Sequence, residues 1–186
     1  MTTAAQAILP VDDDHTLGLA RAGDAAAFAD IVRRHQSMVF SLALHALRNR
    51  TAAEDLAQEV FLELYRSLRR IETPAHVVAW LRRVTSHRCI DELRRRRRQT
   101  ELPIDTVPEL SDGEAFPRCR ELFLEGRLHQ LIAGLPPRAR MVIVLRYQEE
   151  LEPSEIAEIL HMPLNTVKSH VRRSIAVLRA GLVKQE

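Results

Sequence analysis

The chain has 186 residues, of which 46% are hydrophobic and 28% are charged, a composition typical of a soluble globular protein with one domain or two small ones. No apolar stretch approaches the roughly 20 residues that a membrane-spanning helix needs, which excludes membrane insertion. The formal net charge of +2 conceals unlike segments, because residues 21–98 carry sixteen basic and nine acidic side chains whereas residues 99–121 carry two and six.

Cysteine and arginine usage bear on the compartment and on the partner. Cys89 and Cys119 lie far apart, without CxxC spacing or a secretory leader, so a reducing cytoplasm is the expected location. Only Lys168 and Lys184 are lysines, so 25 of the 27 basic residues are arginine. The planar arginine fork suits phosphates and guanine edges, but a GC-rich coding bias would produce the same usage. Both interpretations stay open.

Three helices are expected in the first half of the chain. Apolar residues recur from Phe28 to Ala46 with the spacing of one helix face. The capping-box pattern Thr51-x-x-Glu54 predicts the start of a second helix, and Thr73-Pro74 predicts the N-cap and first turn of a third. The outer face of the second helix would carry Asp55, Gln58, Glu59, Leu62 and Glu63.

The end of the third helix, DELRRRRRQT (91–100), holds five consecutive arginines. Successive helical residues rotate by about 100°, so only two or three of Arg94–Arg98 could face one DNA duplex. Cys89, Ile90 and Leu93 lie off the apolar stripe of this helix. They predict a second packing partner near its end.

Two segments predict flexible chain rather than helix. Residues 99–120, QTELPIDTVPELSDGEAFPRCR, contain three prolines, a glycine and several acids without helical periodicity, which is typical of a linker between two domains. Residues 1–15 include Asp12-Asp-Asp-His15, which we interpret as part of a flexible acidic N-terminus rather than a metal site.

The most informative local pattern is PSEIAEILHMPLNTVKSHVRRSIAVL (153–178). It predicts two short helices on either side of a break at His161-Met-Pro163, which is a helix-turn-helix. The exposed face of the second helix would present side chains that can reach base edges and phosphates in a major groove, although a solvated face would look similar: Thr166, Lys168, Ser169, Arg172 and Arg173. No strand pattern appears, so the chain is expected to be all-α.

Three stretches, in this order and spacing, carry a family resemblance: AEDLAQEVFLELYRSL (53–68), AWLRRVTSHRCIDELRRRRR (79–98) and LPPRARMVIVLRYQEELEPSEIAEILHMPLNTVKSHVRRS (135–174). Over roughly residues 16–183 the chain resembles bacterial sigma factors of the extracytoplasmic-function (ECF) group. The resemblance implies an all-α fold of two small helical domains joined by the flexible acidic linker at 99–120, with a sigma region 2 bundle at 16–98 and a sigma region 4 helix-turn-helix at 121–186. It also implies binding to core RNA polymerase and promoter-specific initiation of transcription.

The resemblance assigns residues to two interfaces in the first domain. The helix that docks on the coiled-coil clamp of the largest catalytic subunit would contribute Asp55, Gln58, Glu59, Phe61 and Leu62, with core packing as the main role of Phe61. The third helix and the loop before it would bind the minus-ten element and hold a flipped base, through Ile71, His76, His87, Arg88, Arg94, Arg95 and Arg98. Ile71 and His87 stand where an aromatic residue and Asn are frequent, so the minus-ten base preference of the family is not carried over.

In the second domain, Thr166, Lys168, Ser169, Arg172 and Arg173 align with positions that contact the minus-35 element. His161 replaces a small residue in the turn, Asn165 a frequent Gly and His170 a frequent Arg. Because Asn tolerates a left-handed conformation better than most residues, the turn is expected to survive.

The resemblance implies core RNA polymerase and promoter DNA as partners, together with an anti-sigma factor, and no cofactor. The acidic linker would pass through the polymerase cleft. Initiation is therefore predicted to weaken when neutral residues replace Glu101, Asp105, Glu109, Asp112 and Glu114.

The main alternative is a helix-turn-helix regulator that binds its operator without polymerase. An enzyme is not expected, because the sequence contains no HExxH, phosphate-binding glycine loop, GxSxG or cysteine cluster.

Overall fold

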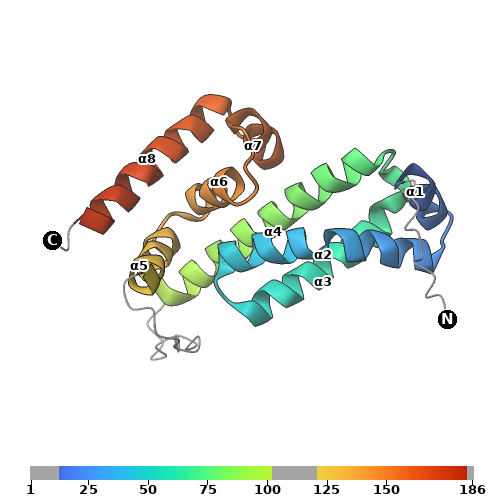
Figure 1. Ribbon diagram of the computed structural model, residues 1–186, viewed down its shortest axis with the longest axis horizontal. Coiled ribbons are helices and arrows are strands. Elements are labelled where there is room, and N and C mark those ends of the chain that lie inside the picture. Colours follow the sequence, from blue (N-terminus) through green and yellow to red (C-terminus); the bar gives the residue numbers. More distant parts are fainter. Residues whose placement is uncertain (1–12, 102–120, 184–186) are drawn as a thin grey trace, which may run out of the picture.

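The computed structural model describes residues 13–101 and 121–183, which form eight α-helices and one 3-10 turn and contain no strand (Figure 1). The all-α prediction is therefore confirmed for this part of the chain. In chain order the elements are α1 (Asp13–Arg21), α2 (Ala25–Leu47), α3 (Arg50–Ser67), η1 (Leu68–Arg70), α4 (Pro74–Glu101), α5 (Glu121–Ala133), α6 (Pro137–Tyr147), α7 (Pro153–Leu160) and α8 (Leu164–Val183).

Two predicted boundaries shift by three residues. The helix α1 begins at Asp13, inside the segment 1–15 expected to be flexible, and α4 continues to Glu101, beyond the domain end expected at residue 98. The remainder of the expected linker, 102–120, lies outside the described residues and includes Asp105, Glu109, Asp112 and Glu114.

Short polar side chains set the starts of the helices in the first half. Asp24 caps α2, because its Oδ1 accepts hydrogen bonds from the amides of Ala26 and Ala27 at 2.8 and 3.0 Å. Thr73 Oγ1 accepts from the amide of His76 at 3.1 Å, so the cap predicted for α4 is confirmed.

The cap predicted for α3 was wrong. Asn49, not Thr51, is the N-cap: its Oδ1 accepts from the amide of Ala52 at 2.8 Å, and Thr51 already lies inside the helix. Glu54 pairs with Arg50 one turn earlier, at 2.9 Å, instead of returning to a capping threonine.

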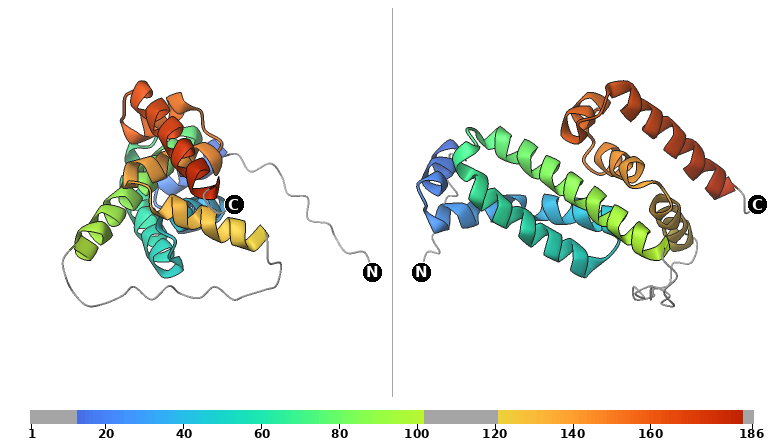
Figure 2. Two further views of the ribbon diagram at one scale, coloured as in Figure 1. Left: turned by 90° about the vertical axis from the view of Figure 1, so that its left-hand side faces the viewer. Right: turned by 180° about the vertical axis from the view of Figure 1, so that it is seen from behind.

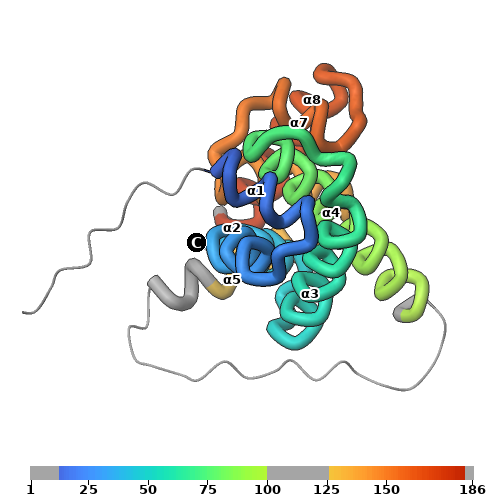
Figure 3. Tube along the Cα trace, turned by 90° about the vertical axis from the view of Figure 1, so that its right-hand side faces the viewer, coloured from blue at the N-terminus to red at the C-terminus, as the bar shows by residue number. Residues whose placement is uncertain are grey.

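The helices α2, α3 and α4 form a bundle whose inward positions follow the helical period, and α1 and η1 close one end of it (Figure 3). Val39 and Leu42 of α2, Leu64 of α3 and Leu81 of α4 are fully buried at its centre. The bundle leaves the outer faces of α3 and α4 available as the first candidate surfaces.

In the second half, α7 and α8 form the predicted helix-turn-helix. Pro153 begins α7, and Glu152 and Glu155 close a reciprocal capping box around it. The left-handed residue of the turn is His161, with φ of 49°, whereas Asn165 is already helical. The turn therefore does not depend on the tolerance of Asn165 for that conformation.

The two halves pack against each other along α4, which contacts α2 and α3 on one side and α6 and α7 on another (Figures 1 and 2). Cys89, Ile90 and Leu93 are buried, and α4 has the second packing partner that these residues predict, because it contacts α6 and α7. The buried apolar residues of both halves form one continuous core cluster.

Polar contacts between described residues also join the halves. Arg82 of α4 pairs with Glu149, just after α6, at 3.1 Å, and the rings of His87 and His161 lie 5.8 Å apart. Arg140 of α6 donates from Nη1 to the carbonyl oxygen of Ala46 at 3.0 Å.

Among the described residues, no helix has the length and apolar character that a membrane span requires.

Candidate functional site

The outer face of α3 combines acidic and exposed apolar side chains. Asp55, Gln58 and Glu59 are exposed, and Leu62 is 58% exposed, whereas Phe61 is buried in the core as expected. The four exposed residues recur at the spacing of one helical face, so the fold presents them together.

Sequence reasoning did not select Tyr65, which extends the same face. Its side chain is 53% exposed and meets Phe28 of α2 edge-on, with ring centroids 5.0 Å apart. A groove of about 680 Å³ between α2 and α3 is lined by Gln58, Leu62 and Tyr65 among others. The sequence did contain an indication that Tyr65 belongs to this face, because Tyr65 follows Leu62 by three residues. An aromatic residue at helical spacing is more often buried, however, and Tyr65 was therefore not selected.

The candidate minus-ten residues do not all lie on an open surface. Ile71 is only 1% exposed, so its side chain belongs to the core and cannot receive a base in this arrangement. His76 is exposed. His87 is half-buried: its Nδ1 lies 2.9 Å from the carbonyl oxygen of Arg83, and its ring faces His161 across the contact between the halves.

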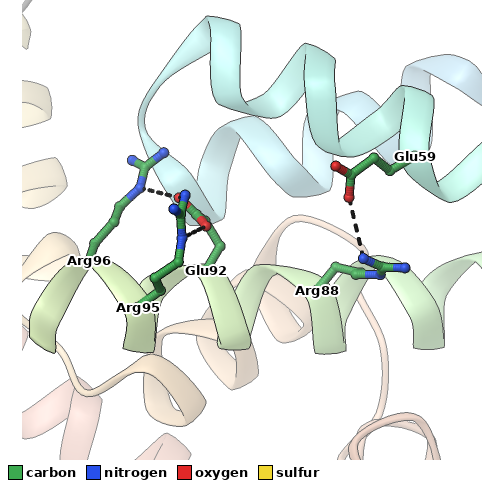
Figure 4. A network of polar contacts seen from close by, with 5 residues as sticks. All are labelled: Glu59, Arg88, Glu92, Arg95 and Arg96. Carbon is green, nitrogen blue, oxygen red and sulfur yellow. Dashed lines mark hydrogen bonds and ion pairs between the residues drawn. The ribbon is translucent and has the colours of Figure 1, made fainter. Parts of the chain in front are cut away.

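The arginine run is helical, and Arg94, Arg95 and Arg96 pair with acids one turn earlier. Figure 4 draws the contacts of Arg95 and Arg96 with Glu92. Arg94 pairs with Asp91 at 3.3 Å, and Glu92 accepts from both Arg95 and Arg96 at 2.8 and 2.7 Å. The hydrogen bond from Arg95 is the main reason that the pKa of Glu92 lies below its usual value. Part of the positive charge of the run is thus compensated locally.

Arg88 pairs in a different way, across to α3. Its guanidinium lies 3.3 Å from Glu59 and 2.6 Å from Glu63. Arg88 and Glu59, but not Glu63, line a groove of about 540 Å³ between α3 and α4, and its lining also includes Asp55, Arg95 and Arg98. The structure therefore brings candidate polymerase-binding and candidate DNA-binding residues together in one groove.

The candidate minus-35 residues all belong to α8. Thr166, Lys168, Arg172 and Arg173 are exposed, and Ser169 is half-buried. Asn165 and His170, which the sequence pattern did not select as contacts, join Thr166, Ser169 and Arg173 around a hollow of about 230 Å³. This helix lies on the opposite side of the molecule from α3 (Figures 1 and 2).

The environment of His170 disfavours its charged form. Its pKa lies below the ordinary value, first because the ring is partly buried and then because Arg173 and Arg138 are close. Among the residues that the structure describes, no group of three His, Cys, Asp or Glu side chains could hold a metal ion.

Comparison with known proteins identifies the family. Residues 31–99 match Sigma-70 region 2, and residues 125–178 match Sigma-70, region 4. ECF RNA polymerase sigma factor SigW of Bacillus subtilis (strain 168) is 33% identical over 171 residues, which cover 86% of this chain and 91% of the relative. The chain belongs to the ECF sigma factors. It is a transcription initiation factor that directs RNA polymerase to promoters.

Other ECF sigma factors agree with this identification. The RNA polymerase sigma-E factor of Streptomyces coelicolor is 30% identical over 164 residues, covering 88% of this chain and 90% of the relative. None of these matches supports the alternative of a regulator that acts without polymerase.

Two solved structures share the fold. One is CnrH in complex with the cytosolic domain of CnrY, with a TM-score of 0.65 and 23% identity, covering 94% of this chain and 99% of that one. The other is the sigma factor RpoE in complex with the anti-sigma factor NepR from Bartonella quintana, with a TM-score of 0.63 and 18% identity, covering 86% and 98%. At these identities the likeness concerns the fold alone.

Proposed function

We propose that this ECF sigma factor uses α3 to bind core RNA polymerase, α4 to bind the minus-ten element and α8 to bind the minus-35 element. The observation that carries the proposal is the division of the surface: an acidic face with exposed Leu62 and Tyr65 on α3, and arginine-rich faces on α4 and α8. Docking and DNA binding would thus use different chemistry on different helices.

The α3 interface would combine charge with apolar anchoring. Basic and hydrogen-bonding groups of the polymerase clamp would contact Asp55, Gln58 and Glu59. The side chain of Leu62 would insert between those clamp groups. Exposed large apolar side chains beside polar ones are typical of binding surfaces. Phe61 would act indirectly, by fixing the helix in the core.

The DNA interfaces would rely on arginine and histidine. Arg88, Arg94, Arg95 and Arg98 would contact phosphates, with His87 beside them once the halves separate, and His76 would offer a ring for stacking. On α8, five polar side chains would enter the major groove: Thr166, Lys168, Ser169, Arg172 and Arg173. Ile71 is left out because its side chain is buried.

An anti-sigma factor would complete the set of partners. This inference is supported by the solved complex of the related sigma factor RpoE with the anti-sigma factor NepR. Promoter DNA and polymerase place the activity in the cytoplasm, and the role requires neither a cofactor nor a catalytic site in this chain.

The direct test is transcription by purified bacterial core polymerase with this chain on fragmented genomic DNA of its host, with every RNA start mapped. Discrete starts that share upstream elements near minus-ten and minus-35 are expected. No starts, with the same core active on another sigma factor, would defeat the proposal.

The assignment of α3 has its own test. Asp55→Asn with Leu62→Ala is expected to weaken core binding about tenfold, because it removes one charge and one exposed apolar anchor. Glu54→Gln is the matched control, since Glu54 pairs with Arg50 within α3. Core binding by size-exclusion chromatography or fluorescence titration measures both, and equal effects would reject the assignment.

A further inference from the structure

The groove between α3 and α4 is the starting point, because two proposed sites share it. Asp55 and Glu59 on its α3 side belong to the polymerase-binding face, whereas Arg88, Arg95 and Arg98 on its α4 side belong to the DNA-binding face. Charged groups this close interact directly, so binding of a charged partner on one side of the groove changes the electrostatic potential on the other side.

Arg88 is the side chain that bridges the two helices. Its Nη1 donates to Glu59 Oε2 at 3.3 Å and its Nη2 donates to Glu63 Oε2 at 2.6 Å, so the fork spans one turn of α3 (Figure 4 draws the Glu59 contact). The pairing raises the pKa of Arg88, chiefly through the hydrogen bond to Glu63. By contrast, Arg94 and Arg95 pair with acids of their own helix.

The bridge can be exchanged for other partners. The Arg88, Glu59 and Glu63 side chains are 47%, 61% and 38% exposed, and ion pairs this accessible to water are weak. A DNA phosphate offers the same fork two oxygens in a charge-assisted contact. A cationic group of a partner offers the carboxylates a substitute for Arg88.

We propose that Glu59 and Glu63 hold Arg88 in the free chain, and that docking of polymerase on the acidic face of α3 releases Arg88 to a promoter phosphate. This inference rests on the proposed function and adds a coupling to it. Polymerase binding strengthens DNA binding by α4, and by reciprocity DNA bound to α4 strengthens docking on α3. The free chain consequently binds DNA less well than its arginine content suggests.

The first arm of the test uses the full chain without polymerase. Glu63→Gln should bind a labelled mixed-sequence DNA duplex about threefold more tightly than the parent chain, beyond the effect of losing one negative charge. The control for that charge is Glu54→Gln, which removes a carboxylate from the same helix that pairs with Arg50. The salt dependence should steepen by about 0.9 in Glu63→Gln, because one more phosphate contact forms.

A double variant isolates the bridge. Adding Arg88→Gln to Glu63→Gln should abolish the gain in affinity for the duplex. Adding Arg88→Gln to the control variant should leave the effect of Glu54→Gln on this affinity unchanged. Equal affinities of Glu63→Gln and Glu54→Gln, or a gain that survives Arg88→Gln, would overturn the inference.

The second arm repeats the comparison with the chain bound to core polymerase, on a promoter fragment found by start mapping. The advantage of Glu63→Gln over Glu54→Gln should vanish, since docking has already released Arg88. An advantage as large as in the free chain would overturn the coupling. If the parent chain did not bind core at all, the proposed function would fail, a result that the first arm cannot produce because it contains no polymerase.

Discussion

His170 illustrates how a single residue of α8 can report DNA binding. Its pKa is lowered by burial and by the neighbouring Arg173 and Arg138, so the free ring is predominantly neutral at neutral pH. A phosphate placed in the adjoining hollow would stabilise the charged ring and raise this pKa. Because the bound state then holds a proton more tightly than the free state, affinity for DNA rises as the pH falls through the interval between the two pKa values.

The expected outcome is a duplex affinity that increases about threefold more in the parent chain than in His170→Gln when the pH falls from about 8 to about 6. Fluorescence anisotropy with a mixed-sequence duplex measures it, and the His170→Gln variant is the control for every other contribution to the pH dependence. Identical pH profiles would exclude a phosphate next to His170.

At the scale of elements, the start of α3 distinguishes two capping residues two positions apart. Asn49→Ala should lower the free energy of unfolding by about 1 kcal/mol, because the amide of Ala52 loses its acceptor. Thr51→Ala should change it by only a few tenths of a kcal/mol, since Thr51 lies inside the helix with an exposed side chain. Urea unfolding compares the two, and a larger loss in Thr51→Ala would contradict the assigned cap.

The sequence predicted most helices because their apolar residues recur with the helical period, and it predicted the turn at His161 from the break in that period. It failed at boundaries, where Asn49 and Thr51 are both good caps and only the backbone geometry selects one. It also failed to identify the burial of Ile71, which depends on helices distant in the chain. The same holds for the pairing of Arg88 with Glu59 and Glu63, which lie 29 and 25 residues earlier in the chain, so no local pattern encodes the contact.

At the scale of the whole molecule, the pair Arg82–Glu149 tests the packing of the two halves. Its side chains are only 27% and 11% exposed, so Glu149→Gln leaves a partly desolvated guanidinium without its counter-charge. The free energy that holds the two halves together should fall by about 1 kcal/mol. Because the halves then separate more often, small-angle scattering should give a larger radius of gyration. Glu150→Gln, at an exposed neighbouring position, should leave the radius unchanged; an equal expansion in both variants would reject the role of the pair.

The packing of α4 against α6 and α7 limits the distance along DNA that the chain can span. A folded chain of this size has a radius of gyration of about 16 Å, so a single packed body is only about 40 Å across. Promoter elements centred about 25 base pairs apart are separated by about 85 Å along a straight duplex, because each base pair adds about 3.4 Å. The packed chain can therefore hold one promoter element at a time, and reading both at once requires the two halves to come apart.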